Sequence, residues 1–148
     1  MREILFRGKR LQGGNWVEGY FFKSDINKRE RESEKATLIF TPDCDTFITV
    51  PECNNSFMVV SDTVGQYTGL KDKNGERIFE GDVCRFREWS NGEMCWVGKV
   101  HWEHQQFMIS GGPNKECETM FELCLSRFIS ENIEVIGNIT DNPELLEK

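Results

Sequence analysis

The side chains best suited to metal or acid–base chemistry lie in the segment His101-Trp102-Glu103-His104. Imidazole nitrogen is a common transition-metal ligand, and two histidines three positions apart share one face of a helix. Here the histidines end an alternating stretch that predicts a strand, in which positions i and i+3 point to opposite faces. We therefore expect His101 and His104 to be ordinary strand-end side chains, and we assign no metal ligands.

The carboxylates are numerous but offer no pair with a defined catalytic spacing. The chain has 25 Asp and Glu residues, and such residues mostly form a solvated surface. Asp62 and Asp82 would hold a divalent ion if the protein were a hydrolase or nuclease, which we keep as an alternative. The sequence contains no P-loop, no G-x-S-x-G motif and no dinucleotide fingerprint. We expect no catalytic residues and no cofactor, and a protein that acts by binding.

The cysteines suggest neither disulfides nor zinc. The chain has 6 of them without a C-x-x-C pair, and spacings such as Cys44 to Cys53 or Cys117 to Cys124 do not match zinc motifs. The N-terminus is charged early and lacks the apolar stretch of a signal peptide. No apolar run approaches the roughly 20 residues of a membrane span. We expect a cytoplasmic protein with reduced thiols and no membrane contact.

Basic and aromatic side chains support an alternative function, nucleic-acid binding. Its contacts would be Arg85, Arg87, Lys99, Trp89 and Trp96, because cations neutralise phosphates and aromatic rings stack on bases. The formal net charge of -7 opposes it, since the field of the whole molecule repels nucleic acid. We therefore expect a protein partner, either a second copy of the chain in a homo-oligomer or a different protein.

Short strands must position these residues, because apolar residues alternate with period two over most of the chain. Two runs, 2–9 and 16–21, flank Gly13-Gly14-Asn15 and predict a hairpin. A two-residue loop at Asn91-Gly92 would pair Phe86 with Val97. Other strands are predicted at 37–40, 47–50, 57–60, 77–79, 83–89, 94–102 and 106–110, and a solvated, highly charged loop at 23–35.

The predicted fold is mostly β with minor α. Short antiparallel strands are expected to form barrel-like sheets, and the stretch from Glu80 to Ser110 resembles part of an SH3-like barrel. Thr119 and Glu122 have capping-box spacing, which predicts a helix that continues to Phe128. Asn142-Pro143 predicts a second short helix near the C-terminus.

A glycine-rich stretch at residues 64–76 invites two interpretations. Asn74-Gly75 predicts a type I′ turn, because both residue types tolerate positive φ. In the first interpretation the glycines permit tight backbone turns, and their neighbours anchor the stretch to the core. In the second, the stretch is a recognition loop, since ordered loops often carry function. Its candidate residues are Gln66, Tyr67, Thr68, Asp72 and Lys73.

Three blocks of sequence carry a resemblance to a known family. They are REILFRGK with NWVEGY (2–9 and 15–20), TVGQYTGLKDKNG with IFEGDV (63–75 and 78–83), and IEVIGNI with DNPELL (133–139 and 141–146). In this order they resemble the YopX family of bacteriophage and prophage proteins.

The resemblance implies a phage or prophage origin in a bacterial host, a β-rich fold and an intracellular setting, so the partner would be a host or phage protein. It implies no reaction. We expect one YopX-like domain over residues 1–148, either undivided or made of an N-terminal β lobe (1–62) and an SH3-like lobe with a C-terminal helix (63–148).

Overall fold

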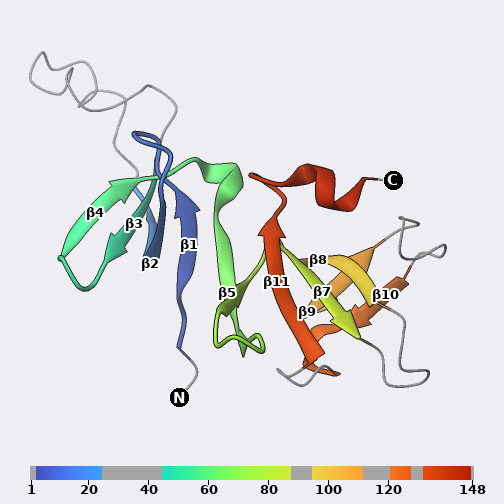
Figure 1. Cartoon of the computed structure of the whole chain (residues 1–148). Helices are drawn as coiled ribbons and strands as arrows, with labels where there is room; N and C mark the ends of the chain where they lie inside the picture. Colours follow the sequence, from blue (N-terminus) through green and yellow to red (C-terminus); the bar gives the residue numbers. More distant parts are fainter. Residues whose placement is uncertain (1–2, 25–44, 88–94, 112–120, 128–131, 148) are drawn as a thin grey trace, which may run out of the picture. The chain divides into compact units, whose positions relative to one another are not determined.

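The computed structural model describes residues 3–24, 45–87, 95–111, 121–127 and 132–147. The chain divides into an N-terminal unit, Ile4–Gly65, and a C-terminal unit, Gln66–Lys148 with Met1–Glu3. Both units consist of short antiparallel strands joined by turns (Figure 1). Of the charged loop predicted at 23–35, Lys23 ends β2 and residues 25–35 lie outside the described residues, as do the strand predicted at 37–40 and the Asn91-Gly92 turn.

In its described residues, 4–24 and 45–65, the N-terminal unit is an antiparallel meander of four strands followed by one 3-10 turn. Its elements are β1 (Phe6–Lys9), β2 (Trp16–Lys23), β3 (Thr46–Val50), β4 (Asn55–Met58) and η1 (Ser61–Thr63), and the strands are neighbours in the order β4-β3-β2-β1. The predicted first hairpin is confirmed, with Phe6 opposite Gly19 and Lys9 opposite Trp16. Gly13 and Gly14 take positive φ in its turn, a conformation that glycine adopts without steric cost.

Alternation along β2 separates two faces of this meander. On one face Phe21 packs against Phe6, with ring centroids 5.2 Å apart, and Ile48 and Val59 are fully buried nearby. Gly8 lies under these side chains, because a Cβ there would sit 3.0 Å from Ile48 Cδ1. The other face presents the even-numbered residues of β2, among them the exposed rings of Tyr20 and Phe22.

The C-terminal unit combines a hairpin with a five-stranded antiparallel sheet. The hairpin pairs β5 (Gly65–Lys71) with β6 (Arg77–Phe79). The sheet contains β7 (Asp82–Arg87), β8 (Cys95–Glu103), β9 (Gln106–Gly111), β10 (Phe121–Cys124) and β11 (Ile133–Asn138), in the order β10-β9-β8-β7-β11. Two 3-10 turns, η2 (Leu125–Arg127) and η4 (Pro143–Leu146), follow β10 and β11.

One face of the five-stranded sheet builds the hydrophobic core. The buried cluster consists of Ile78, Cys84, Phe86, Val100, Phe107, Ile109, Leu125 and Ile133, with Leu70, Trp96, Leu123 and Val135 packed against it. The opposite face of the sheet carries the polar residues Arg85, Lys99, His101, Glu122 and Glu134. It also carries the buried apolar residues Val83, Val97 and Met108. We call this second surface the polar face.

The mostly-β fold of short antiparallel strands is confirmed, but two details of the prediction are wrong. Over the described residues the sheets remain open and do not close into a barrel. The helix predicted to extend to Phe128 is replaced by β10 and η2, because residues 121–124 pair with the free edge of β9. Long-range ladder hydrogen bonds override the local helical spacing there.

The helical segments of the described chain are single 3-10 turns. At η4, Pro143 occupies the predicted first turn, but Asn142 makes no side-chain cap. Its Oδ1 instead accepts a 3.4 Å hydrogen bond from the backbone N–H of Asn138. Among the residues that the structure describes, no helix is long and apolar enough to cross a membrane.

Two predicted local geometries also differ. Phe86 lies opposite Trp96 rather than Val97, and Cys84 lies opposite Gly98. A one-residue shift moves every side chain of the partner strand to the other face, which is how Trp96 joins the core. In the β5–β6 turn, Gly75 has a φ of +84° and Asn74 has no positive φ, so the turn is not type I′.

Candidate functional site

Most side chains of the candidate recognition loop are buried or half-buried in the fold. Tyr67, Thr68 and Asp72 are buried, Gln66 is half-buried and Lys73 is exposed. The Tyr67 ring packs on Phe79, with centroids 5.5 Å apart. Thr68 Oγ1 donates a 2.8 Å hydrogen bond to the carbonyl of Ile78. These contacts hold β5 to β6, so Tyr67 and Thr68 have the structural role that the first interpretation gives to this stretch.

Asp72 is a buried carboxylate that joins the β5–β6 turn to β11. Its Oδ1 accepts hydrogen bonds from the backbone N–H groups of Asn74 and Glu76, at 2.8 and 2.9 Å. Its Oδ2 accepts a third from Val135, at 3.0 Å. Burial of the carboxylate is the largest single influence and raises the pKa of Asp72. Hydrogen bonds from the three backbone donors and from the Asn74 side chain together lower it by more, and the net pKa lies below the ordinary value of 3.8.

Lys73 continues the same connection on the surface. Its backbone N–H bonds the carbonyl of Ile133 at 3.0 Å, and its Nζ lies 2.7 Å from Glu134 Oε2. The hydrogen bond from Lys73 lowers the pKa of the Glu134 carboxyl below its usual range. A ligand that recruited Lys73 would therefore have to displace this ion pair.

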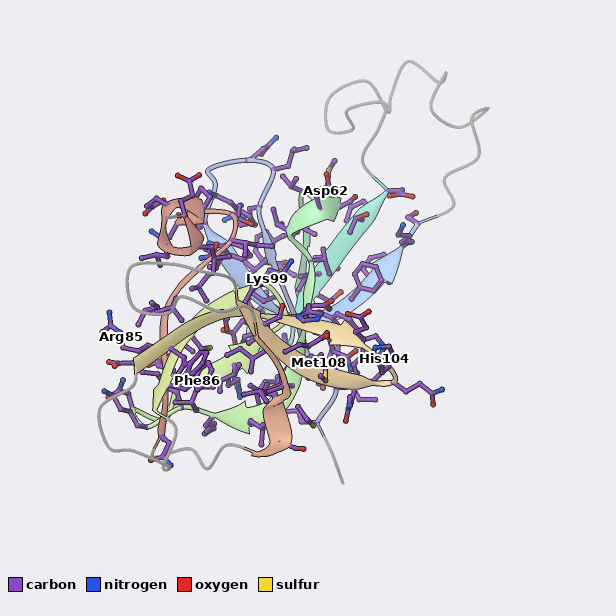
Figure 2. The ribbon with its side chains drawn as sticks, turned by 90° about the vertical axis from the view of Figure 1, so that its right-hand side faces the viewer. Asp62, Arg85, Phe86, Lys99, His104 and Met108 are labelled. Carbon is purple, nitrogen blue, oxygen red and sulfur yellow. The ribbon has the colours of Figure 1, made fainter. Side chains whose placement is uncertain are left out.

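The candidate nucleic-acid contacts are not brought together on one surface. Arg85 and Lys99 belong to the polar face, where Arg85 lies opposite Glu134 on β11. Trp96 lies on the core face, where its ring stacks on Phe86 with centroids 6.4 Å apart. Figure 2 labels Arg85 and Phe86, successive residues of β7 that project to opposite sides of the strand. The Arg87 side chain and Trp89 lie outside the described residues.

The carboxylates of the hydrolase alternative belong to different units. Asp62 is exposed in η1. Asp82 is fully buried at the start of β7, where its Oδ2 accepts a 2.7 Å hydrogen bond from the Phe79 N–H. That bond gives the Asp82 carboxylate a structural role in the turn between β6 and β7.

The two histidines occupy different backbone environments, as expected for a strand end. His104 and Gln105 have φ values of +51° and +63° and form the turn between β8 and β9 (Figure 2), a two-residue connection with the positive φ pair typical of type I′. His101 is within β8. Its Nε2 lies 3.2 Å from Glu103 Oε2 and 3.4 Å from Glu122 Oε1.

Sequence reasoning missed this three-residue cluster. The signal for Glu103 was present, because a His-x-Glu pair in a strand shares one face. The capping-box spacing predicts a helix at Glu122, and only the pairing of β10 with β9 carries its side chain to His101.

A row of aromatic side chains lies on the outward face of β2. We call Trp16, Tyr20 and Phe22 the β2 aromatic row. The guanidinium of Arg7 lies over the Trp16 ring, 4.7 Å from its centroid, and Phe22 stacks on Phe47 with centroids 5.2 Å apart and planes 13° apart. Tyr20 is 57% exposed and Phe22 41% exposed. The row therefore presents ordered rings to solvent.

Comparison with known proteins identifies the family. A family model described as YopX protein matches residues 5–147, nearly the whole chain. The chain belongs to the YopX family. A search of curated proteins finds no match. A solved structure, the crystal structure of protein EF1440 from Enterococcus faecalis, shares 22% sequence identity with this YopX protein; the match covers 99% of this chain and 100% of that chain, with a TM-score of 0.48.

Two exposed features of this YopX protein make no evident contribution to its core. One is the β2 aromatic row in the N-terminal unit, and the other is the cluster of His101, Glu103 and Glu122 in the C-terminal unit. Both lie within the range matched by the family model.

Proposed function

We propose that this YopX protein is a phage- or prophage-encoded accessory protein of the bacterial cytoplasm that acts by binding another protein through its β2 aromatic row. The observation that carries the proposal is the exposure of Tyr20 and Phe22 on the outward face of one strand. The family resemblance supports the phage origin and the cytoplasmic setting.

The composition of this surface favours protein recognition. Trp, Tyr and Arg are the residues most enriched where interfaces concentrate their binding energy, and Trp16, Tyr20 and Arg7 occupy one face of β1 and β2. Stacking of Phe22 on Phe47 and of Arg7 over Trp16 limits the motion of these side chains before binding. Less conformational entropy is then lost when a partner covers them.

The partner can be a second copy of the chain or a different protein, and one pair of measurements separates these cases. Light scattering after size-exclusion chromatography reports self-association. Affinity capture from infected or induced bacterial cells, followed by mass spectrometry, reports other proteins, and sequencing of captured nucleic acid tests the nucleic-acid alternative.

Replacing Tyr20 and Phe22 with threonine is expected to abolish the interaction while leaving the fold intact. Threonine preserves strand propensity, and truncating each interface aromatic costs about 2 kcal/mol, or roughly thirtyfold in Kd. Leu11→Thr is the matched control, because Leu11 is 40% exposed but lies in the turn outside β2. Binding that survives the double change, or that is lost equally in the Leu11 variant, contradicts the proposal.

A further inference from the structure

The polar face of the five-stranded sheet gathers three metal-ligating side chains from two strands. His101 and Glu103 are two positions apart on β8, and Glu122 is on β10. Strand β9 lies between β8 and β10, with His101 opposite Met108 and Ser110 opposite Glu122. Residues that face each other across a ladder share a side of the sheet, so all three side chains project from the same side of it.

We propose that His101, Glu103 and Glu122 bind a divalent transition-metal ion, with Zn²⁺ as the ion of best fit. Their ligand atoms all lie within 4.8 Å of one another. With Zn–N and Zn–O bonds of about 2.1 Å, neighbouring ligand atoms of a tetrahedral site are about 3.4 Å apart. The distances of 3.2 and 3.4 Å from His101 Nε2 to the two carboxylates match that separation.

The other ring nitrogen of His101 is held in the manner of a metal ligand. Nδ1 lies 3.4 Å from the carbonyl oxygen of Lys99 and 3.4 Å from Ser110 Oγ. Metal-binding histidines usually donate their second N–H to such a carbonyl, which fixes the tautomer and orients the ring. With Nδ1 as the donor, the Nε2 lone pair is directed toward two carboxylates, and a cation between them relieves the repulsion.

The site is open on its solvent side. The side chains of His101, Glu103 and Glu122 are 20%, 51% and 45% exposed. Three protein ligands at a tetrahedral ion leave one position for water or an exchangeable ligand. An imidazole with two carboxylates favours borderline ions such as Zn²⁺ over the soft ions that thiolates select.

A nearby thiol could also bind zinc, so its replacement is the main control for the binding experiment. Cys124 lies on the same face of β10 as Glu122, in line with Met108 and His101. Its Sγ contacts Gln106 Oε1 at 3.1 Å and Ser126 Oγ at 2.9 Å. The proposed site does not use this thiol, so zinc binding must survive Cys124→Ser.

Isothermal titration of the full-length, reduced, chelator-treated protein with Zn²⁺ tests the proposal. We expect one ion per chain and a rise in the unfolding temperature on adding Zn²⁺. Glu122→Gln and His101→Gln should each lower the affinity at least tenfold. Glu76→Gln, which removes one exposed carboxylate elsewhere, and Cys124→Ser should bind as the unmodified chain does. Circular dichroism establishes that each variant is folded.

Three results would overturn the site. Unchanged affinity in both ligand variants would show that any bound zinc lies elsewhere, and loss of binding in Cys124→Ser would assign it to thiols. Absence of binding at millimolar Zn²⁺ would show that His101 only forms ion pairs with Glu103 and Glu122. None of these results bears on the β2 aromatic row, because the two proposals use different residues in different units.

Discussion

Replacing Asp72 with alanine is expected to destabilise the C-terminal unit by about 3 kcal/mol, because hydrogen bonds to a charged acceptor contribute about 1.5–3 kcal/mol each and a buried donor left unpaired costs about 1–3 kcal/mol. The carboxylate is only 3% exposed and accepts from Asn74, Glu76 and Val135. The first two N–H groups lie in an exposed turn and can regain water. The N–H of Val135 is within β11 and cannot do so as easily.

Asparagine at position 72 separates the contributions of the two carboxylate oxygens. The amide keeps Oδ1 for Asn74 and Glu76 but places a donor against the N–H of Val135, so we expect an intermediate loss. Lys73→Ala removes only an exposed ion pair with Glu134 and should leave stability nearly unchanged. Urea unfolding measured by circular dichroism, with hydrogen exchange at Val135, ranks the stabilities of these variants and the unmodified chain. Equal stability of Asp72→Ala and the unmodified chain would contradict the role given to Asp72.

The contribution of Asp72 should also depend on pH. Its pKa is raised by burial but lowered further by the three backbone donors and the Asn74 side chain together, so the folded value lies below 3.8. A carboxylate whose pKa is depressed by folding stabilises the native state above its unfolded pKa, and the stabilisation is lost as the pH falls through the folded value. The stability difference between the unmodified chain and Asp72→Ala should therefore be constant near neutral pH and shrink below about pH 4. A stability difference that grows on acidification would show that folding raises the pKa of Asp72 instead of lowering it.

Gly19→Ala is expected to destabilise the N-terminal unit strongly, with a loss of about 3 kcal/mol or more. The added Cβ would overlap the carbonyl oxygen of Thr49. That oxygen belongs to the backbone of β3, which is paired with β2 at Tyr20. A backbone atom held in a ladder cannot move aside as a side chain can, so the two strands would have to separate locally.

Gly8→Ala is the control for this prediction. A Cβ at Gly8 would lie 3.0 Å from Ile48 Cδ1 and 3.1 Å from Val59 Cβ, so its neighbours need to give way by only a few tenths of an ångström. The flexible end of Ile48 can shift, so we expect a smaller loss of about 1 kcal/mol. Thermal unfolding of both variants tests the ranking. If Gly19→Ala unfolds at the same temperature as the unmodified chain, β2 does not approach β3 this closely.

Features with local causes were predictable from the sequence. Period-two alternation at residues 2–9 and 16–21 predicted the first hairpin, and the Gly13-Gly14 turn needs the positive φ that glycine supplies. The mostly-β class followed from the same alternation, and the three sequence blocks pointed to the family now shown by the match over residues 5–147. The first hairpin and the mostly-β class depend on neighbours within a few positions along the chain.

The candidate sites depended on contacts that no local pattern contains. The register of β7 against β8 differs by one residue from the expected one, and this places Trp96 in the core instead of opposite Arg87 on the face that carries Arg85. Glu122 reaches His101 only because β10 pairs with β9 where a helix was predicted. Strand register and edge pairing are chosen by burial and by ladder hydrogen bonds between distant segments. Alternation assigns residues to the two faces of each strand, but only the folded sheet selects which residues become neighbours.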